Sequence, residues 1–354
     1  MKTIEINTGR PYMIKVEEGL LDHLPQLIYE VYAKRKPSFA IITDDTVDML
    51  YSAKVMCALR DGGYQVCKFV FPHGEASKNL SVVHDVYSFL CEHQITRTDV
   101  IIALGGGVVG DLAGFAAATY LRGIDFIQIP TTFLAMIDSS VGGKTGVDIP
   151  QGKNLIGAFW QPVLVVCDPL TLTTLPAETY ADGIAEAVKY GAILDEKLFG
   201  ILENNRLEQY QDHVICRCIE LKKQVVEQDE RDQGQRQCLN FGHTFGHAIE
   251  KYSNFSLSHG KGVAIGMVMM AKACENAGIT PAGTSVRLIR CLNNYHLPCT
   301  YPIPLDILCE NCMGDKKRAG SKITLCVLKR IGEYALYPIE AENLSSFAGG
   351  GLYE

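Results

Sequence analysis

Long apolar runs are missing from this sequence of 354 residues. Strand-like runs such as Val100 to Leu104 are far too short to cross a bilayer. The first residues, Met1 to Glu5, also lack the apolar stretch of a secretion signal. We therefore expect no membrane segment and a cytoplasmic location.

A surplus of positive charge is missing as well. The chain has 33 Lys and Arg residues against 40 Asp and Glu residues, so its formal net charge is −7. This balance disfavours a general nucleic-acid or acidic-membrane binder, which needs an excess of cations. We expect an anionic small molecule, if one binds, to be held by a local cluster of Lys and Arg side chains.

Paired cysteine motifs are the third absence. Thirteen cysteines are scattered along the chain. Cys309-Glu-Asn-Cys312 and Cys216-Arg-Cys218 each lack the matching second half that a metal or redox site requires. An odd count in a chain of this length favours free thiols in a reducing compartment over a disulfide framework.

The first half of the chain alternates strand-like runs with amphipathic stretches such as Thr46 to Arg60 and Leu80 to His93. A chain of this length is expected to form two domains. The alternation predicts an α/β domain of residues 1–175 with a Rossmann-like, mostly parallel sheet and helices on both faces. The predicted strands are Phe39 to Thr43, Gln65 to Phe71, Val100 to Leu104, Phe126 to Ile129 and Val163 to Asp168.

From about Pro176 onward, apolar residues recur at helical spacing, which predicts a mainly α-helical domain of residues 176–354. A β-hairpin is expected from Ile323 to Tyr337, and the Gly-rich tail from Ser345 to Gly351 is expected to be loose. The predicted helices are Ala181 to Leu194, His213 to Glu230, Asn240 to Tyr252 and Gly260 to Ala277.

Two glycine-rich loops in the first half are candidates for binding an anion. Leu104-Gly-Gly-Gly-Val-Val-Gly-Asp111 follows a predicted strand and leads into a helix that starts near Val108. Backbone N–H groups and the helix dipole at such a junction suit the pyrophosphate of a dinucleotide, although a plain tight turn is the alternative. Asp44 follows an earlier strand, where a carboxylate can accept from a ribose hydroxyl. The second loop is Asp138-Ser-Ser-Val-Gly-Gly-Lys-Thr145, which lacks the spacing of a Walker motif. Lys144 and Lys153 stand in Gly-rich loops, where lysines rarely serve packing, so we expect both to contact an anion.

A candidate metal site lies in the second half. His243 and His247 share one helix face at i,i+4, and His259 starts the next predicted helix. Glu186 stands among Ile, Ala and Val, where a carboxylate is costly to bury without a cation. One Glu and two His residues with an open position form a catalytic site of the Zn²⁺ type, and Zn²⁺ and Co²⁺ are equally suited to it. The spacing leaves open which two histidines bind, and solvated histidines on capped helices are the alternative.

Cations and one amide gather around this segment: Lys189, Lys222, Arg236 and Asn240. Lys222 and Arg236 taken singly are equally consistent with a charged helix surface. Their closeness to the histidines favours a role in binding an anionic substrate.

These motifs, in consistent order from about residue 38 to about residue 330, resemble the 3-dehydroquinate synthase family. In the first half the resemblance is carried by Gly105–Asp111, Leu121–Gly123, Pro130–Thr132, Asp138–Gly146 and Gly152–Leu155. In the second half it is carried by Ala185-Glu186, Lys189, Leu239–His247 and His259-Gly260.

The resemblance implies a lyase of the shikimate pathway that converts 3-deoxy-D-arabino-heptulosonate 7-phosphate to 3-dehydroquinate and phosphate. It implies transient oxidation by NAD⁺, phosphate elimination, reduction and an intramolecular aldol step, in a homodimer with a divalent metal. It implies the metal ligands Glu186, His243 and His259, which leaves His247 for the substrate. Further substrate contacts are implied for Lys144, Asn154, Lys189, Lys222, Arg236, Asn240, Asp138, either Lys316 or Lys317, and Arg122 reaching a neighbouring subunit. NAD contacts are implied for Asp44, Glu75, Lys78, Gly107, Val108, Val109, Gly110, Asp111, Thr131, Thr132, Lys144, Lys153, Thr171, Leu172, Thr173 and Thr174.

The sequence departs from the family pattern at four places. Glu178-Thr179 stands where Arg-Glu is usual, and Asp148 stands where Asn is usual. Asp232 replaces a Glu, and His259-Gly-Lys-Gly262 replaces His-Gly-Glu-Ala. None of the four is a predicted metal ligand.

Three other functions are compatible with parts of the pattern. A sibling sugar-phosphate cyclase, of the 2-deoxy-scyllo-inosose synthase type, acts on a neutral sugar phosphate and has no need for Lys222 and Arg236 together. A metal-dependent polyol dehydrogenase needs fewer cations and accumulates NADH. A non-catalytic nucleotide-binding module has no use for the metal ligands.

Overall fold

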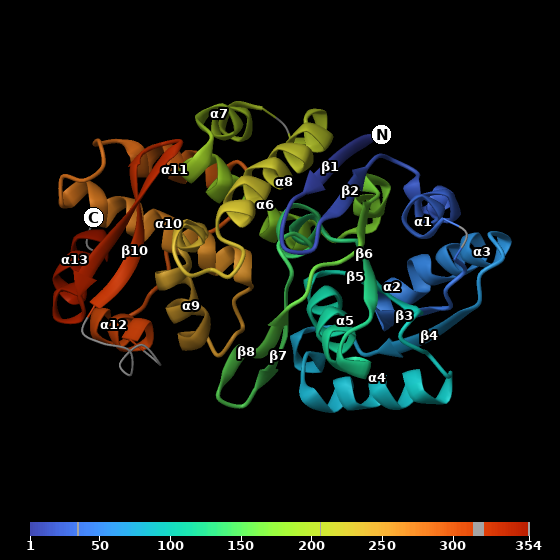
Figure 1. Ribbon diagram of the computed structural model, residues 1–354. Helices are drawn as coiled ribbons and strands as arrows, with labels where there is room; N and C mark the ends of the chain where they lie inside the picture. Colours follow the sequence, from blue (N-terminus) through green and yellow to red (C-terminus); the bar gives the residue numbers. More distant parts are fainter. Residues whose placement is uncertain (34, 206, 314–321, 353–354) are drawn as a thin grey trace. The chain divides into compact units, whose positions relative to one another are not determined.

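The computed structural model describes residues 1–33, 35–205, 207–313 and 322–352, and Figure 1 shows their fold. The chain divides into two compact units, Met1–Pro176 with Lys222–Arg231, and Ala177–Leu221 with Asp232–Glu354. The division into domains of residues 1–175 and 176–354 stays a prediction, because compactness alone does not show independent folding.

The first unit is built on a seven-stranded sheet with the order β1-β2-β9-β6-β5-β3-β4. From β2 to β4 in this order every neighbouring pair is parallel, whereas β1 pairs antiparallel with β2. The five predicted strands are confirmed, and the β1–β2 pair is an addition. The strands are β1 (Lys2–Ile6), β2 (Tyr12–Val16), β3 (Phe39–Asp44), β4 (Val66–Phe71), β5 (Val100–Gly105), β6 (Asp125–Pro130) and β9 (Leu164–Cys167).

Helices cover both faces of this sheet (Figure 1). Alternate residues of a strand point to opposite faces: Ile41 and Ile102 pack with apolar side chains of α1 and α3, whereas Ile42 and Ile101 pack with those of α4 and α5. Both faces are therefore buried, as a parallel sheet requires. The helices are α1 (Leu24–Tyr32), α2 (Asp45–Val47), α3 (Ala53–Asp61), α4 (Leu80–Glu92) and α5 (Gly107–Thr119).

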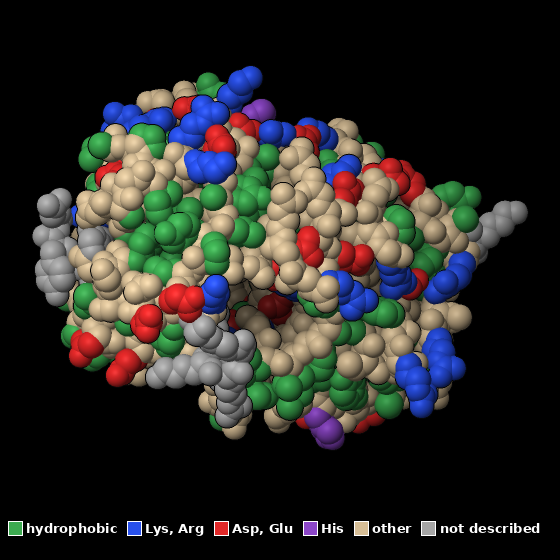
Figure 2. Space-filling view, turned by 60° about the vertical axis from the view of Figure 1, so that its left-hand side comes forward, with side chains coloured by type: hydrophobic (Ala, Val, Ile, Leu, Met, Phe, Trp, Pro, Cys, Tyr) green, Lys and Arg blue, Asp and Glu red, His purple; other side chains and the backbone are tan. Residues whose placement is uncertain are grey.

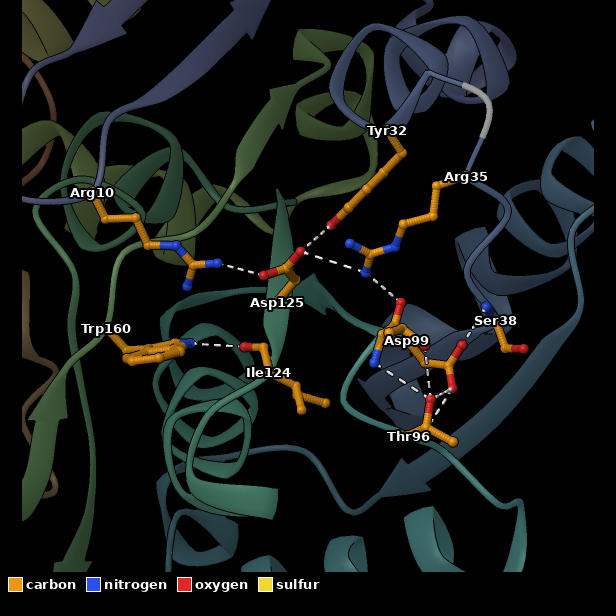
Figure 3. Close-up of polar contacts among 10 residues, drawn as sticks. Arg10, Tyr32, Arg35, Ser38, Thr96, Asp99, Ile124, Asp125 and Trp160 are labelled. Carbon is orange, nitrogen blue, oxygen red and sulfur yellow. Dashed lines mark hydrogen bonds and ion pairs between the residues drawn. The ribbon is translucent and has the colours of Figure 1, made fainter.

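The amino ends of three central strands are held by a polar network (Figure 3). Asp125, at the start of β6, accepts hydrogen bonds from Arg10 and, at 3.1 Å, from the Tyr32 hydroxyl. Asp99, just before β5, accepts the backbone N–H of Ser38, just before β3, at 2.8 Å. These carboxylates are satisfied by neighbouring donors, so this edge of the sheet is stabilised structurally, and the opposite, carboxyl edge is left for ligands.

The region around Lys144 and Lys153 is a β-hairpin rather than the pair of loops that we expected. Strand β7 (Lys144–Ile149) pairs antiparallel with β8 (Gly152–Phe159). Gly146 and Gly157 lie side by side in the ladder, where a Cβ on Gly157 would lie 2.3 Å from the carbonyl oxygen of Thr145. The glycines therefore allow close strand contact, which the loop interpretation overlooked.

The second unit is mainly helical, and its centre is α10 (His259–Asn276), which is buried along most of its length. A helix that is apolar on all sides belongs in a core. Around it are α6 (Ala177–Leu194), α7 (Glu196–Asn204), α9 (His243–Tyr252), α11 (Thr284–Asn293) and α12 (Leu305–Met313), with the predicted hairpin present as β10 (Lys322–Arg330) and β11 (Glu333–Glu340). Helix α8 (Gln211–Gln228) passes from this unit to the first at Lys222.

The prediction of a loose tail was wrong. Residues Leu344–Leu352 form helix α13, which packs against α10 and α12. Leu344 and Ala348 lie one turn apart and are 0% and 1% exposed. Their i,i+4 spacing buries one face of the helix, and this outweighs the high intrinsic cost of glycine in a helix.

None of the helices in the part of the chain that the structure describes has the length and apolar character that crossing a bilayer requires. On the face in Figure 2, Lys and Arg side chains lie interspersed with Asp and Glu side chains. This mixture agrees with the expectation that cations matter locally rather than as one large field.

Candidate active site

The predicted cofactor residues gather at the carboxyl edge of the sheet. The chain continues from β3 to β4 on one side and from β5 to β6 and β9 on the other, so the strand order reverses between β3 and β5. Ligands of open α/β sheets bind beyond the strands at such a switch point. Asp44 ends β3, Thr131 and Thr132 follow β6, and Thr171 to Thr174 follow β9 within the 3₁₀ turn Pro169–Thr174.

The glycine loop joins β5 to α5 at this switch point. Helix α5 begins at Gly107, and its N-cap residue Gly106 provides no side-chain hydrogen bond to the first turn. The N–H groups of a first helical turn need an acceptor from outside the helix. The loop therefore fits a phosphate group, and the structure puts Gly107, Val108 and Val109 in that first turn.

Lys78 is a buried cation at the centre of a cluster of partly exposed carboxylates. Its side chain is 4% exposed, and its Nζ lies 2.7 Å from Glu75, 3.4 Å from Asp111 and 3.8 Å from Asp148. Burial, opposed by Lys78, raises the pKa of Asp111 to about 6. Asp148 also accepts the backbone N–H of Asn154 at 2.7 Å, which holds that residue at a positive φ of 56°. The cluster thus ties the β7–β8 hairpin to the predicted cofactor residues.

Lys222 is buried rather than spread on a charged surface. It is 6% exposed, and its Nζ donates to the carbonyl oxygen of Asp138 at 2.7 Å and to the Asp138 carboxylate. Arg236, in the 3₁₀ turn Gln235–Asn240 of the second unit, is 2% exposed. Cations are costly to bury without anionic partners. Lys222 has Asp138 as its anionic partner, and neither Lys222 nor Arg236 lies on a plain charged surface.

The predicted metal residues meet in the second unit. Glu186 of α6 is completely buried, and the Nε2 atoms of His243 and His259 lie 3.3 and 3.4 Å from its Oε1 atom. Its other oxygen contacts the Nζ atom of Lys189 one turn along the helix. One ligand atom from each of Glu186, His243 and His259 lies within 4.8 Å of the others. The donor set and its spacing fit a small divalent cation.

Glycines at two helix contacts bring these ligands together. Gly242, just before α9, and Gly246 on α9 face Gly262 and Gly266 on α10, and a Cβ at Gly266 would lie 2.0 Å from the carbonyl oxygen of Gly242. Gly260 rests on the backbone of Asp182 in the same way, with a Cβ distance of 2.4 Å. Because each histidine directly neighbours one of these glycines, the close helix contact positions the imidazoles beside α6.

The His243 imidazole is oriented by a contact of its Nδ1 atom. His243 has Nδ1 at 3.1 Å from the carbonyl oxygen of Phe241, so that Nε2 faces Glu186. Burial and the nearby Lys189 charge lower the pKa of His243, which favours the neutral form that binds metals. Burial raises the pKa of Glu186, but Lys189 and then His243 outweigh it, so this pKa lies well below its ordinary value. The Glu186 carboxyl group therefore favours its ionised form.

Two further predicted substrate residues, His247 and Asn240, lie close to His243 in the sequence. His247 is exposed, and its ring centroid lies 5.3 Å from that of His243 and 5.8 Å from that of His259. Asn240 ends the 3₁₀ turn that precedes α9, rather than lying inside α9 as we expected, because Gly242 adopts a positive φ of 80° and starts the helix anew.

Arg122 lies elsewhere, in the first unit. Leu121, Arg122 and Gly123 all have positive φ, with values of 51°, 68° and 117°. This backbone presents Arg122 as an exposed side chain. Lys316 and Lys317 lie outside the described residues.

Two of the departures from the family pattern are near each other. The Lys261 Nζ atom lies 3.9 Å from a carboxylate oxygen of Glu178. Glu178 is exposed and Lys261 is partly exposed, and contacts of this kind contribute little to stability.

Sequence reasoning missed Glu250. Its Oε1 atom lies 3.0 Å from His259 Nδ1, and its side chain is nearly fully buried. The signal was present, because Glu250 follows His243 and His247 at i+7 and i+3 and so lies on the same helix face.

Comparison with known proteins places the chain in a family. The family model described as 3-dehydroquinate synthase N-terminal matches residues 68–182, and the C-terminal model matches residues 183–318. The 3-dehydroquinate synthase of Clostridium acetobutylicum is 46% identical over 97% of this chain and 98% of its own length. That of Streptococcus suis strain 05ZYH33 is 44% identical over 95% of this chain and 96% of its own length.

A solved structure is similar throughout. The crystal structure of 2-deoxy-scyllo-inosose synthase complexed with carbaglucose-6-phosphate, NAD⁺ and Co²⁺ superposes with a TM-score of 0.88 at 26% identity. The match covers 99% of this chain and 100% of that one. The two 3-dehydroquinate synthase models together span most of the chain, and the 3-dehydroquinate synthase of Clostridium acetobutylicum is 46% identical to it, against 26% for the solved cyclase. This chain therefore belongs to the 3-dehydroquinate synthase family.

Proposed function

We propose that this chain converts 3-deoxy-D-arabino-heptulosonate 7-phosphate to 3-dehydroquinate and inorganic phosphate, with NAD and a divalent cation as cofactors. The observation that carries the proposal is the buried cluster of Glu186, His243 and His259 in a chain that belongs to this family. The carboxyl edge of the sheet, with its glycine loop, supports NAD as the second cofactor.

Glu186, His243 and His259 would hold the cation. When bound, a divalent cation stabilises negative charge on a substrate oxygen as a Lewis acid. The buried Glu186 carboxylate supplies the negative charge, and His243, whose pKa is lowered, supplies a neutral donor. Hydrogen bonds to Glu186 and Glu250 outweigh burial and raise the pKa of His259 to about 10, so this imidazole would release a proton when the cation binds. Of the two metals that suit this donor set, we propose zinc for the enzyme in the cell.

The glycine loop and the strand ends would hold NAD. When bound, NAD⁺ supplies a hydride acceptor that is restored within each turnover. The first-turn N–H groups of Gly107, Val108 and Val109 are suited to its pyrophosphate. Asp44 accepts the backbone N–H of Val47 at 2.8 Å, which fixes the carboxylate at the end of β3, where a ribose hydroxyl can reach it. Further contacts are proposed for Glu75, Lys78, Gly110, Asp111, Thr131, Thr132, Lys144, Lys153, Thr171, Leu172, Thr173 and Thr174.

Buried cations would hold the anionic substrate. Lys222 is held by Asp138 before any ligand arrives, so little reorganisation is needed when charge develops on the substrate. Lys189 and Arg236 are 1% and 2% exposed and keep their charges away from bulk water. Fixed charges also hold the substrate in one pose. Lys144, Asn154 and Asn240 are proposed as further contacts.

His247 would serve proton transfer or hydrogen bonding to the substrate. Its ring is exposed beside the two proposed ligands, and an imidazole can donate or accept a proton near neutral pH. We further propose a cytoplasmic homodimer in which Arg122 reaches the substrate of the neighbouring subunit. The strained turn that exposes Arg122 supports its role toward a neighbouring subunit. The free cysteines along the described chain support a reducing compartment.

The test is to incubate the pure protein with the heptulosonate phosphate, NAD⁺ and Zn²⁺ while measuring inorganic phosphate, 3-dehydroquinate and NADH absorbance. We expect stoichiometric phosphate and dehydroquinate without lasting NADH. Stoichiometric NADH would indicate a dehydrogenase, and phosphate release from a neutral hexose phosphate alone would indicate a sibling cyclase.

One variant within the cluster of Glu186, His243 and His259, and one control variant outside it, connect this activity to the cluster. Glu186→Gln keeps the shape but removes the charge, so we expect zinc affinity to fall by about 10²-fold or more, with activity falling as well. Gly200→Ala changes a helical residue with nothing within 4 Å of the added Cβ, so both properties should stay as in the parent protein.

A further inference from the structure

We propose that Glu250 is a positioning residue that keeps the proton of the His259 imidazole on Nδ1 and so presents Nε2 to the metal ion. This inference rests on the metal site of the proposed function. Glu250 Oε1 lies 3.0 Å from His259 Nδ1, and His259 Nε2 lies 3.4 Å from Glu186 Oε1. The imidazole therefore stands between two carboxylates, one at each nitrogen.

With a metal ion at Nε2, the tautomer follows from this arrangement. A neutral imidazole carries one proton, and the nitrogen without it has the lone pair that binds a metal. If Nδ1 donates to Glu250, the lone pair of Nε2 points toward Glu186 and His243. A carboxylate accepts more strongly than a carbonyl group, and such an outer partner also raises the basicity of the ligating nitrogen. Glu250 therefore acts on the metal through His259.

The place of Glu250 is well defined. Its side chain is 4% exposed, so water does not compete strongly for Nδ1. Across the contact between α9 and α10, Gly262 leaves room for it, because a Cβ at that position would lie 2.9 Å from Glu250 Cγ and 3.0 Å from its Oε1. The packing of this chain thus accommodates the carboxylate in the orientation that meets His259.

A competing interpretation makes Glu250 a ligand itself. His247, Glu250 and His259 also place one donor atom each within 4.8 Å of one another. That arrangement would use Nδ1 of His259 for a second ion, whereas the positioning role needs a proton on the same atom. The number of ions bound per chain separates the two roles.

The test measures zinc affinity by competition with a chromophoric chelator, and the absorption spectrum and stoichiometry of Co²⁺, on the full chain. We expect one Co²⁺ per chain, zinc binding about 10- to 100-fold weaker in Glu250→Ala, and an altered cobalt spectrum in that variant. Glu250→Gln keeps an oxygen acceptor and should bind zinc with an affinity between those of the parent protein and the alanine variant.

The matched control is Glu203→Gln. Glu203 is likewise buried, and its carboxylate accepts hydrogen bonds from Arg287, at 3.0 Å, and from Arg290, both on α11, so zinc affinity and the cobalt spectrum should not change. Equal zinc affinity in the parent protein and both Glu250 variants overturns the inference. Two Co²⁺ per parent chain and one per Glu250→Ala chain overturn it in favour of a ligand role. If the alanine variant does not fold, the glutamine variant decides: an unchanged affinity and spectrum refute the role. Failure of the parent protein to bind any metal contradicts the proposed function instead.

Discussion

The contact between α9 and α10 makes Gly266→Ala a sharp test of how the ligands are positioned. The added Cβ would lie 2.0 Å from the Gly242 carbonyl oxygen and 2.7 Å from the Gly246 nitrogen. Ordinary contact begins at 3.4 Å, so the helices must separate by about 1.4 Å (3.4 − 2.0) along the first of these lines. Both opposing atoms belong to the backbone, so no rotamer change relieves the overlap.

The separation is large compared with what a metal site tolerates. Ligand distances vary by roughly 0.2 Å, and functional geometry is held within about 0.5 Å. His243 and His259 lie on the two separating helices, so we expect zinc affinity to fall by about 10²-fold or more. Overpacking costs about 1–3 kcal/mol, of which alanine's better helix propensity offsets up to about 1 kcal/mol.

The assay combines chelator competition for zinc affinity with urea unfolding for stability. Gly200→Ala in α7 is the matched control, because the same substitution there meets nothing within 4 Å and should be neutral or slightly stabilising. A Gly266→Ala protein with the parent zinc affinity and the parent unfolding free energy would refute the reasoning. Far-ultraviolet circular dichroism distinguishes a displaced helix from a protein that has not folded.

Three further predictions concern charge and metal. Burial raises the pKa of Glu203, but hydrogen bonds from Arg287 and Arg290 outweigh it and leave this pKa below its ordinary value. The stabilisation of the folded state by ionised Glu203 is therefore present above about pH 4.3 and is lost as pH falls through the lowered pKa. Glu203→Gln should therefore lower the free energy of unfolding by about 1–3 kcal/mol at pH ~7 and by progressively less in acid. A loss of unfolding free energy that does not depend on pH, measured by urea unfolding, would contradict a role for the ion pairs. Lys78→Met leaves neighbouring carboxylates, Asp111 among them, without their cation, so the pKa of Asp111 should rise above about 6. An acid with a raised folded pKa costs stability as pH rises past its unfolded value, so stability should fall more steeply than in the parent protein between about pH 4 and 7, and parallel urea curves would refute this. Removing the metal with a chelator should lower the unfolding temperature, and added Zn²⁺ should restore it, whereas an unchanged temperature would argue against a folded-state metal site.

Local pattern accounts for much of the fold. The runs around Ile41 and Ile102 are almost wholly apolar, as strands buried on both faces must be, and they lie at the centre of the sheet. The period of 3.6 in the second half predicts its helices, and His259 begins one of them as expected. By contrast, the β7–β8 hairpin was mistaken for loops because its glycines serve close strand contact rather than turns.

The candidate site shows where such reasoning ends. The residues themselves indicated a metal site with Glu186 and two of three histidines, because a carboxylate in an apolar helix needs a cation. Spacing could not choose among the histidines, since His243 and His247 lie equally well on one face of α9; only the resemblance to the family named the pair. The tertiary structure brings His243 and His259 to Glu186, and it reveals Glu250 behind His259, because the crossing of α9 and α10 depends on glycine contacts between residues distant in sequence. Periodicity records which side of a segment is buried, whereas the partner that buries it is decided by long-range packing.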